Sequence, residues 1–148
     1  GRRDLMEQLA PTGPVYQAGT LSGNPVAVAA GLATLRQLDA TVYASLEAAG
    51  ARIEQGMSSA VNYHGCSFRR VGSMFTLFFR GAAPNNFSEV QECDLDAFGR
   101  FFRAALSGGV YLPPSQYEAA FLNASITERQ VAQVVDGLTS ALVAAHLH

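Results

Sequence analysis

The chain has 148 residues, a length that suits a single domain able to bury about two thirds of its unfolded surface. Apolar residues make up 49% of the chain and charged residues only 15%. This charged fraction is below that of a typical globular domain, as expected for a segment that buries surface against another part of a protein. The net charge of −2 gives no reason to expect nucleic acid or an anionic membrane as a partner, and no run of about 18 apolar residues occurs. We therefore expect a cytoplasmic protein.

The first 25 residues contain a loop with the features of an anion site. A short amphipathic helix at most is expected before the first proline. In the loop that follows, Gly19 and Gly23 permit positive φ and the close approach of a ligand, and Thr20 offers a hydroxyl and an N–H group. Asn24 and Pro25 suit the N-cap and first position of a helix. Such a loop can hold a phosphate, although a capped turn without a ligand explains the same residues.

Two long helices are predicted next. Residues 26–38 alternate small and larger apolar side chains at helical spacing, which suits either a helix buried against another domain or subunit or an ordinary alanine-rich core helix. Residues 42–61 predict the second helix, with Ile53 and Met57 on its apolar face. His64 follows beside a glycine and is expected to be a turn residue rather than an acid or base.

A β-hairpin is predicted after the second helix. Residues 66–70 and 74–80 have the composition of strands joined through Gly72, and the aromatic side chains of the second strand suit a core. Residues 81–93 are polar and include Pro84 and two asparagines, so we expect a mobile loop there.

A third long helix, capped by Asp94 or Asp96, is predicted up to Gly108. Its expected buried face consists of Leu95, Phe98, Phe102 and Leu106. Residues 110–112 predict a short strand, which Pro113–Pro114 prevents from extending into a ladder. The chain must turn at this point.

Residues 115–118, which end at Glu118, follow that turn on a stiff loop. Side chains in such a position face a cleft, although a solvated surface charge is the common alternative for a glutamate. A capping box of Thr127 and Gln130 then predicts the start of the final helix. Its apolar stripe is Val131, Val134, Val135, Leu138 and Leu142, and His146 and His148 are expected at a fraying terminus without a function. Helices packed on one side of a small antiparallel sheet indicate an α+β fold.

Two residue types constrain the chemistry. Cys66 and Cys93 lie far apart without a CxxC or Cys/His pattern, so we expect free thiols and no metal site. The chain contains ten arginines and no lysine, and a lysine amine is the nucleophile that forms a Schiff base with pyridoxal phosphate (PLP).

Three motifs resemble those of class III PLP-dependent enzymes, in the same order and at similar spacing. They are Gly19–Pro25, Gly72–Phe79 and Gly109–Phe121. The first resembles the loop that closes on the cofactor phosphate throughout the class. The last, with its Pro-Ser-Gln-Tyr-Glu-Ala run, is similar to the aminomutases of the class in particular.

This resemblance implies a site and a domain plan. Gly19 and Thr20 would bind the phosphate of PLP or pyridoxamine phosphate (PMP) in the neighbouring subunit of a homodimer, and Glu118 would be a substrate-site carboxylate. The Schiff-base lysine would lie upstream of the loop, so the chain would be the C-terminal part of a larger enzyme and inactive alone. Residues 1–40 would belong to the large domain, and residues 41–148 would form the C-terminal small domain of a fold-type I PLP enzyme.

The function implied by the resemblance is an intramolecular amino transfer on a small-molecule substrate, giving 5-aminolevulinate for tetrapyrrole synthesis. Two alternatives remain open. One is a class III aminotransferase, which passes the amino group between two substrates. The other is a dimerisation or docking module without chemistry, which the lack of lysine in the chain favours.

Overall fold

The computed structural model describes residues 1–146, which fall into two units, Gly1–Leu38 and the described part of Asp39–His148. The first unit contains α1 (Arg3–Met6) and α2 (Pro25–Leu35). The short first helix and the start of the second agree with the sequence prediction. The assignment of residues 1–40 to a large domain stays a prediction, and His148 lies outside the described residues.

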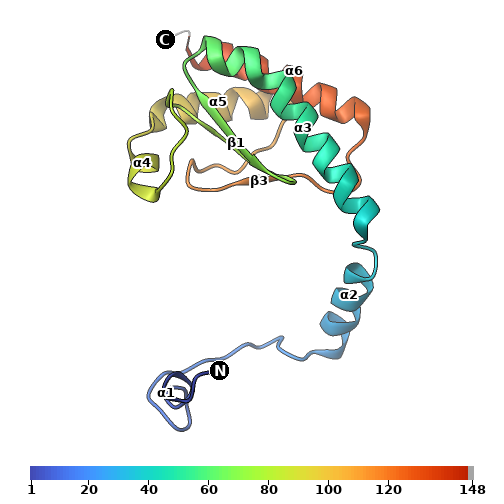
Figure 1. Cartoon of the computed structure of the whole chain (residues 1–148), viewed down its shortest axis with the longest axis vertical. Helices are drawn as coiled ribbons and strands as arrows, with labels where there is room; N and C mark the ends of the chain where they lie inside the picture. Colours follow the sequence, from blue (N-terminus) through green and yellow to red (C-terminus); the bar gives the residue numbers. More distant parts are fainter. Residues whose placement is uncertain (147–148) are drawn as a thin grey trace. The chain divides into compact units, whose positions relative to one another are not determined.

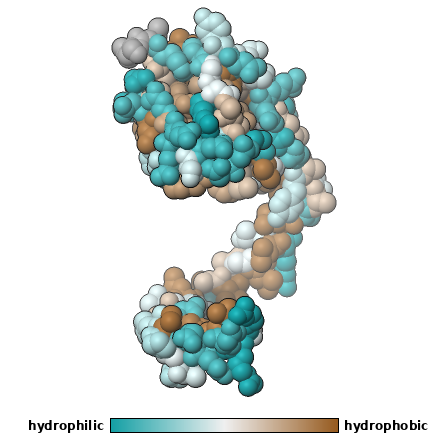
Figure 2. Space-filling model, turned by 60° about the vertical axis from the view of Figure 1, so that its left-hand side comes forward, coloured by the Kyte–Doolittle hydropathy of each residue, from teal (hydrophilic) through white to brown (hydrophobic). Residues whose placement is uncertain are grey.

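The N-terminal unit has no core of its own. None of the residues of α2 is buried, and Val26, Val28 and Leu35 are 77%, 56% and 66% exposed. Figure 2 shows apolar surface on this part of the chain. A helix that is apolar all round normally lies buried within a larger structure.

The C-terminal unit is an α+β fold, as the sequence predicts. A three-stranded antiparallel sheet has the order β1-β2-β3, and the long helices cover one of its faces (Figure 1). The elements are α3 (Ala40–Tyr63), β1 (Ser67–Val71), β2 (Met74–Phe78), α4 (Phe87–Gln91), α5 (Leu95–Ser107), β3 (Ala120–Phe121) and α6 (Glu128–Ala145). None of the described helices is long and apolar enough to cross a membrane.

The hairpin of β1 and β2 supplies the sheet side of the core. Its register pairs Ser67 with Phe78 and Val71 with Met74, and Gly72 turns the chain with φ 58°. Alternate side chains of β2 point to opposite faces, which buries Phe75 and Leu77 under the helices. The helix side of the core includes Ile53, Met57, Phe98, Phe101, Leu138 and Leu142.

The predicted buried face of α5 is partly wrong. Leu95 and Leu106 are 43% and 46% exposed, whereas Phe98 is buried as expected. The residues of α5 that are buried are Ala97, Phe98, Phe101 and Ala105. Phe101 and the two alanines complete the face because α5 packs closely on α6, where small side chains allow the helices to approach.

The third strand lies later in the chain than predicted. Residues 110–112 form no strand, and β3 instead follows the two prolines, where Ala120 and Phe121 pair with Phe75 and Met74 of β2. Proline has no N–H to donate to a ladder, so pairing with β2 begins only after the chain has turned.

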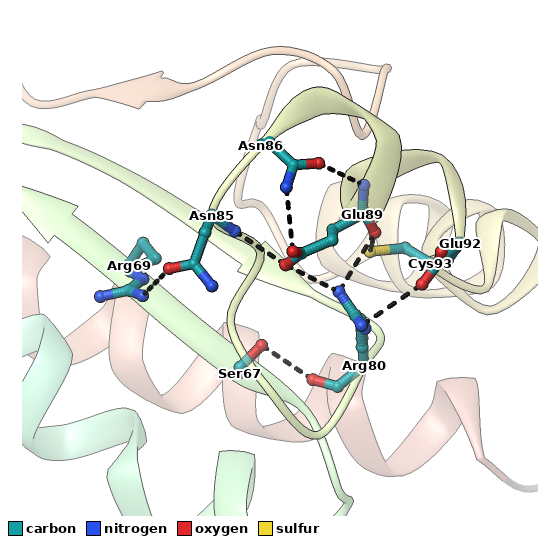
Figure 3. A network of polar contacts seen from close by, with 8 residues as sticks. All are labelled: Ser67, Arg69, Arg80, Asn85, Asn86, Glu89, Glu92 and Cys93. Carbon is teal, nitrogen blue, oxygen red and sulfur yellow. Dashed lines mark hydrogen bonds and ion pairs between the residues drawn. The ribbon is translucent and has the colours of Figure 1, made fainter.

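The predicted mobile loop at 81–93 contains a capped helix, α4, held by polar contacts (Figure 3). Asn86 and Glu89 cap each other, since Glu89 N donates to Asn86 Oδ1 at 3.0 Å and Asn86 Nδ2 donates to Glu89 Oε1 at 2.9 Å. Arg80 bridges Glu89 and Glu92 at 3.3 Å each. The Asn85 amide lowers the pKa of the Glu89 carboxyl, and Arg80 adds to this effect. The Asn-x-x-Glu pattern is a capping signature that the sequence contained.

The final helix begins as predicted, with the complete capping box of Thr127 and Gln130. It crosses α3 closely at Gly56, where an added Cβ would lie 2.7 Å from Cγ1 of Val135. Cys66 and Cys93 are both free and buried, which confirms the expectation from their spacing.

Candidate functional site

The loop before α2 is a pair of tight turns. Ser22 N donates to Gly19 O at 3.0 Å, and Asn24 N donates to Leu21 O at 3.1 Å. Gly23 adopts the predicted positive φ, at 74°. Gly19 is not among the glycines with positive φ, but a Cβ there would lie 2.3 Å from Ser22 Oγ, so the turn leaves no room for a side chain.

The cap of α2 decides which donors of this loop are free. Asn24 Oδ1 accepts from the amides of Val26 and Ala27 at 3.0 and 3.1 Å, so these helical N–H groups already have a partner. Within the described part of the chain, the amide and the hydroxyl of Thr20 have no hydrogen-bond partner, and Thr20 is exposed. A phosphate at this loop would therefore be held by Thr20 rather than by the first turn of α2, which corrects the simpler picture of a helix-terminus site.

The Glu118 loop is ordered by its own turn. Glu118 N donates to Ser115 O at 3.1 Å, and Tyr117 N donates to Ser115 Oγ at 3.2 Å. Glu118 itself is exposed, and the described residues provide no cation that pairs with it. Its carboxylate borders a groove of about 520 Å³ that runs beside residues 109–123. The carboxylate is thus available to a charged group from outside this unit.

Gln116 is the buried member of the same turn. Its side chain is 3% exposed, and Nε2 donates to Leu77 O of β2 at 2.9 Å. Its Oε1 is buried and has no hydrogen-bond partner among the described residues. The prediction that the side chains of residues 115–118 face a cleft is therefore wrong for Gln116, and the reason is a partner carbonyl that lies 39 residues earlier in the chain.

The predicted site residues lie in different units. Gly19 and Thr20 are in Gly1–Leu38 and Glu118 is in Asp39–His148, so each part of the site is defined within its own unit. Residues 1–146 contain no group of three or more histidine, cysteine or acidic side chains that could hold a metal ion.

His64 is a turn residue, as predicted, and caps α3. Its ring stacks on that of His146 with the centroids 4.5 Å apart, a contact that the sequence analysis missed. Burial, together with the neighbouring His146, lowers the pKa of His64. Burial also raises the pKa of the Cys66 thiol to about 11, which makes this sulfur a poor nucleophile at neutral pH.

Comparison with known proteins gives strong sequence matches. The chain is 47% identical over 146 residues to a glutamate-1-semialdehyde 2,1-aminomutase of Methanoculleus marisnigri and 50% identical over 138 residues to one of Myxococcus xanthus. These matches cover 97% and 91% of the chain but 34% and 32% of the relatives. The chain thus spans about a third of the length of the curated relatives that it matches. No family model matches it.

Solved structures share the fold at lower sequence identity. A transaminase with PLP bound matches with a TM-score of 0.71 at 21% identity, over 98% of this chain and 34% of that one. A variant glutamate-1-semialdehyde aminomutase from Pseudomonas aeruginosa PAO1, in complex with PMP, matches with a TM-score of 0.74 at 21% identity. That match covers 88% of this chain and 30% of the other.

Proposed function

The chain is homologous to the C-terminal portion of glutamate-1-semialdehyde 2,1-aminomutases, and on that premise we propose that it forms this portion of such an enzyme. The reaction would move an amino group between adjacent carbons of one substrate to give 5-aminolevulinate for tetrapyrrole synthesis. The observation that carries the proposal is the identity of 47–50% over more than nine tenths of the chain. We call the protein that joins this chain to a lysine-bearing N-terminal part the parent enzyme.

Thr20 is the proposed phosphate ligand. When bound, PLP would supply an aldehyde that reacts with amines and a ring that draws electrons away from the carbon that carries the amino group. Among the described residues, the hydroxyl and amide of Thr20 are unpaired donors, and Gly19 allows the tight turn that presents them, since a Cβ there would lie 2.3 Å from Ser22 Oγ. These features fit a phosphate, which accepts charge-assisted hydrogen bonds. We further propose a cytoplasmic homodimer in which this loop binds the cofactor of the neighbouring subunit.

The chain alone would have no activity. It contains no lysine, so the amine that holds the cofactor would have to come from another part of the parent enzyme. The exposed apolar residues of α2 also suit a helix that is covered in a larger protein.

Glu118 is the proposed carboxylate that controls the fate of the intermediate. Its exposed position beside a groove leaves it free to pair with an arginine of the N-terminal part that handles the substrate carboxylate. Such a pair would moderate the positive charge and set the relative affinities for successive bound species. An aminomutase must retain its diamino intermediate through both halves of the reaction, so it requires this control.

An aminotransferase of the same class is the second candidate, because a transaminase shares the fold over nearly the whole chain. The two reactions differ in their need for a second substrate. An aminomutase converts glutamate-1-semialdehyde completely on its own, whereas an aminotransferase stops after one half-reaction until an acceptor is added.

The test compares the isolated chain with the parent enzyme. One portion of each is incubated with PLP, reduced with borohydride and analysed by mass spectrometry. A separate portion, incubated with PLP but not reduced, is supplied with glutamate-1-semialdehyde. We expect a stoichiometric reduced adduct and 5-aminolevulinate formation in the parent enzyme only. A specific adduct on the isolated chain, or a parent enzyme that turns over only with an added amino acceptor, would contradict the proposal.

A further inference from the structure

Along the edge of β2 that faces β3, every second residue has a backbone or side-chain partner from another segment. Backbone N–H and C=O groups of alternate residues point to the same side of a strand, so Ser73, Phe75, Leu77 and Phe79 form this edge. Three different segments supply the four partners: Leu122 N donates to Ser73 O at 3.0 Å, Ala120 lies opposite Phe75, Gln116 Nε2 donates to Leu77 O at 2.9 Å, and Asp94 N donates to Phe79 O at 3.2 Å. Gln116 is therefore the side-chain member of an otherwise backbone-made ladder.

The loop that carries Gln116 cannot pair with β2 by its own backbone at the prolines. Pro113 and Pro114 have no N–H group, and β3 begins only at Ala120. Between these points, within the described part of the chain, the side chain of Gln116 donates the hydrogen bond that joins the loop to the sheet. The loop is thus fixed at two places, by the paired backbone of β3 and by one amide.

The anchor is two residues from Glu118. The turn that begins at Ser115 holds Gln116 and Glu118 in one hydrogen-bonded unit, with Glu118 N bound to Ser115 O. Gln116 points into the core while Glu118 is exposed at the groove. A shift of the buried amide would therefore move the exposed carboxylate.

We propose that Gln116 is the positioning residue that holds the Glu118 carboxylate in place at the substrate site. The inference rests on the proposed aminomutase function and adds a residue to it. Gln116 touches no substrate and acts through the turn. Its buried Oε1 has no partner among the described residues, so the amide is kept at this place despite the cost of a buried unpaired acceptor.

Two substitutions separate positioning from packing. Gln116→Met keeps the length of the side chain and removes the donor. Gln116→Glu keeps the shape, and its carboxyl can donate to Leu77 O only when protonated. Burial raises the pKa of a carboxyl, which brings this protonation into an accessible pH range. Gln133, an exposed glutamine of α6, receives the same two changes as a control.

The readout in the parent enzyme is the ratio of completed isomerisation to escaped diamino intermediate in single turnovers. We expect Gln116→Met to lower it about three- to tenfold at every pH, the equilibrium effect of one neutral hydrogen bond. At each pH the ratio of a variant is divided by the ratio of the unmodified enzyme at the same pH. For Gln116→Glu this quotient should be close to one at acidic pH. It should fall toward that of Gln116→Met as pH rises. The Gln133 variants should leave the ratio unchanged.

Hydrogen exchange on the 148-residue chain gives a second readout that needs no cofactor. Gln116→Met should speed exchange of the Glu118 amide while the amides of α6 keep their protection. If this variant fails to fold, Gln116→Glu decides alone, because its protonated form retains the bond. The positioning role would be overturned if the parent enzyme is active and both Gln116 variants have the same ratio as the unmodified enzyme at every pH. A parent enzyme without isomerisation would overturn the proposed function first, and with it this inference.

Discussion

The Thr20 hydroxyl offers the most direct test of the proposed cofactor loop. Thr20→Val keeps the β-branched shape of the side chain and removes only the hydroxyl. Because the Thr20 hydroxyl is unpaired in the structure, the substitution breaks no hydrogen bond within residues 1–146. Any loss of affinity for PLP would therefore report a bond to the cofactor rather than damage to the loop.

The expected magnitude follows from the charge of the phosphate. A hydrogen bond to a charged group contributes about 1.5–3 kcal/mol, which corresponds to a PLP dissociation constant raised about 10- to 150-fold. The Thr20 amide remains, so binding should weaken rather than disappear. We would titrate the apo parent enzyme with PLP at fixed ionic strength, because salt screens exposed charges.

Thr34→Val in α2 is the matched control. The Thr34 hydroxyl is exposed and donates to Ala30 O at 3.0 Å, so this change removes an equivalent group from the same unit without touching the loop. It should leave PLP affinity unchanged. Equal affinities in the Thr20 variant and the unmodified enzyme would refute the phosphate-binding role and favour a capped turn without a ligand.

Three further predictions concern the C-terminal unit. Glu118→Gln in the parent enzyme should lower the ratio of completed isomerisation to released diamino intermediate, and thermal unfolding should change little because Glu118 is exposed; an unaltered ratio and rate would leave Glu118 a surface charge. Gly56→Ala should cost up to about 2 kcal/mol of unfolding free energy, since overpacking against Val135 by about 1–3 kcal/mol exceeds the helix propensity gain of about 1. Adding Val135→Ala should relieve this strain, and strictly additive urea-unfolding energies would contradict the close approach. Cys66, with its pKa raised from 9.0 to about 11, should react with a thiol reagent at pH 8 about a hundredfold more slowly than in the urea-unfolded chain. The unfolded thiol loses its proton first as pH rises, so this group's contribution to stability should decline between about pH 9 and 11, and equal labelling rates in the two states would argue against its burial.

Local signals in the sequence predicted local structure well. The caps at Asn24 and Thr127 and the turn at Gly72 depend on residues within four positions of one another, and all three are confirmed. The Asn86–Glu89 cap has the same local character, and its signature could have replaced the mobile loop prediction. Helix ends and tight turns are therefore readable before any tertiary packing is known.

Features that depend on distant partners were not predictable from pattern alone. Which side of α5 is buried depends on where α6 lies, and the third strand depends on which segment reaches the free edge of β2. The contact of Gln116 with Leu77 links residues 39 apart and leaves no periodic trace in the sequence. The roles of Thr20 and Glu118 come from resemblance, and they remain predictions.

The alternating partners along β2 also bear on self-association. An exposed strand edge offers a row of open N–H and C=O groups on which a strand of another molecule can add. Along β2 this row is filled from Ser73 to Phe79 by partners drawn from three different segments of the chain. Loss of the Gln116 amide would open one position between two closed ones, which is too short a gap for a foreign strand to enter. The β2 edge is thereby protected against aggregation even though β3 is only two residues long.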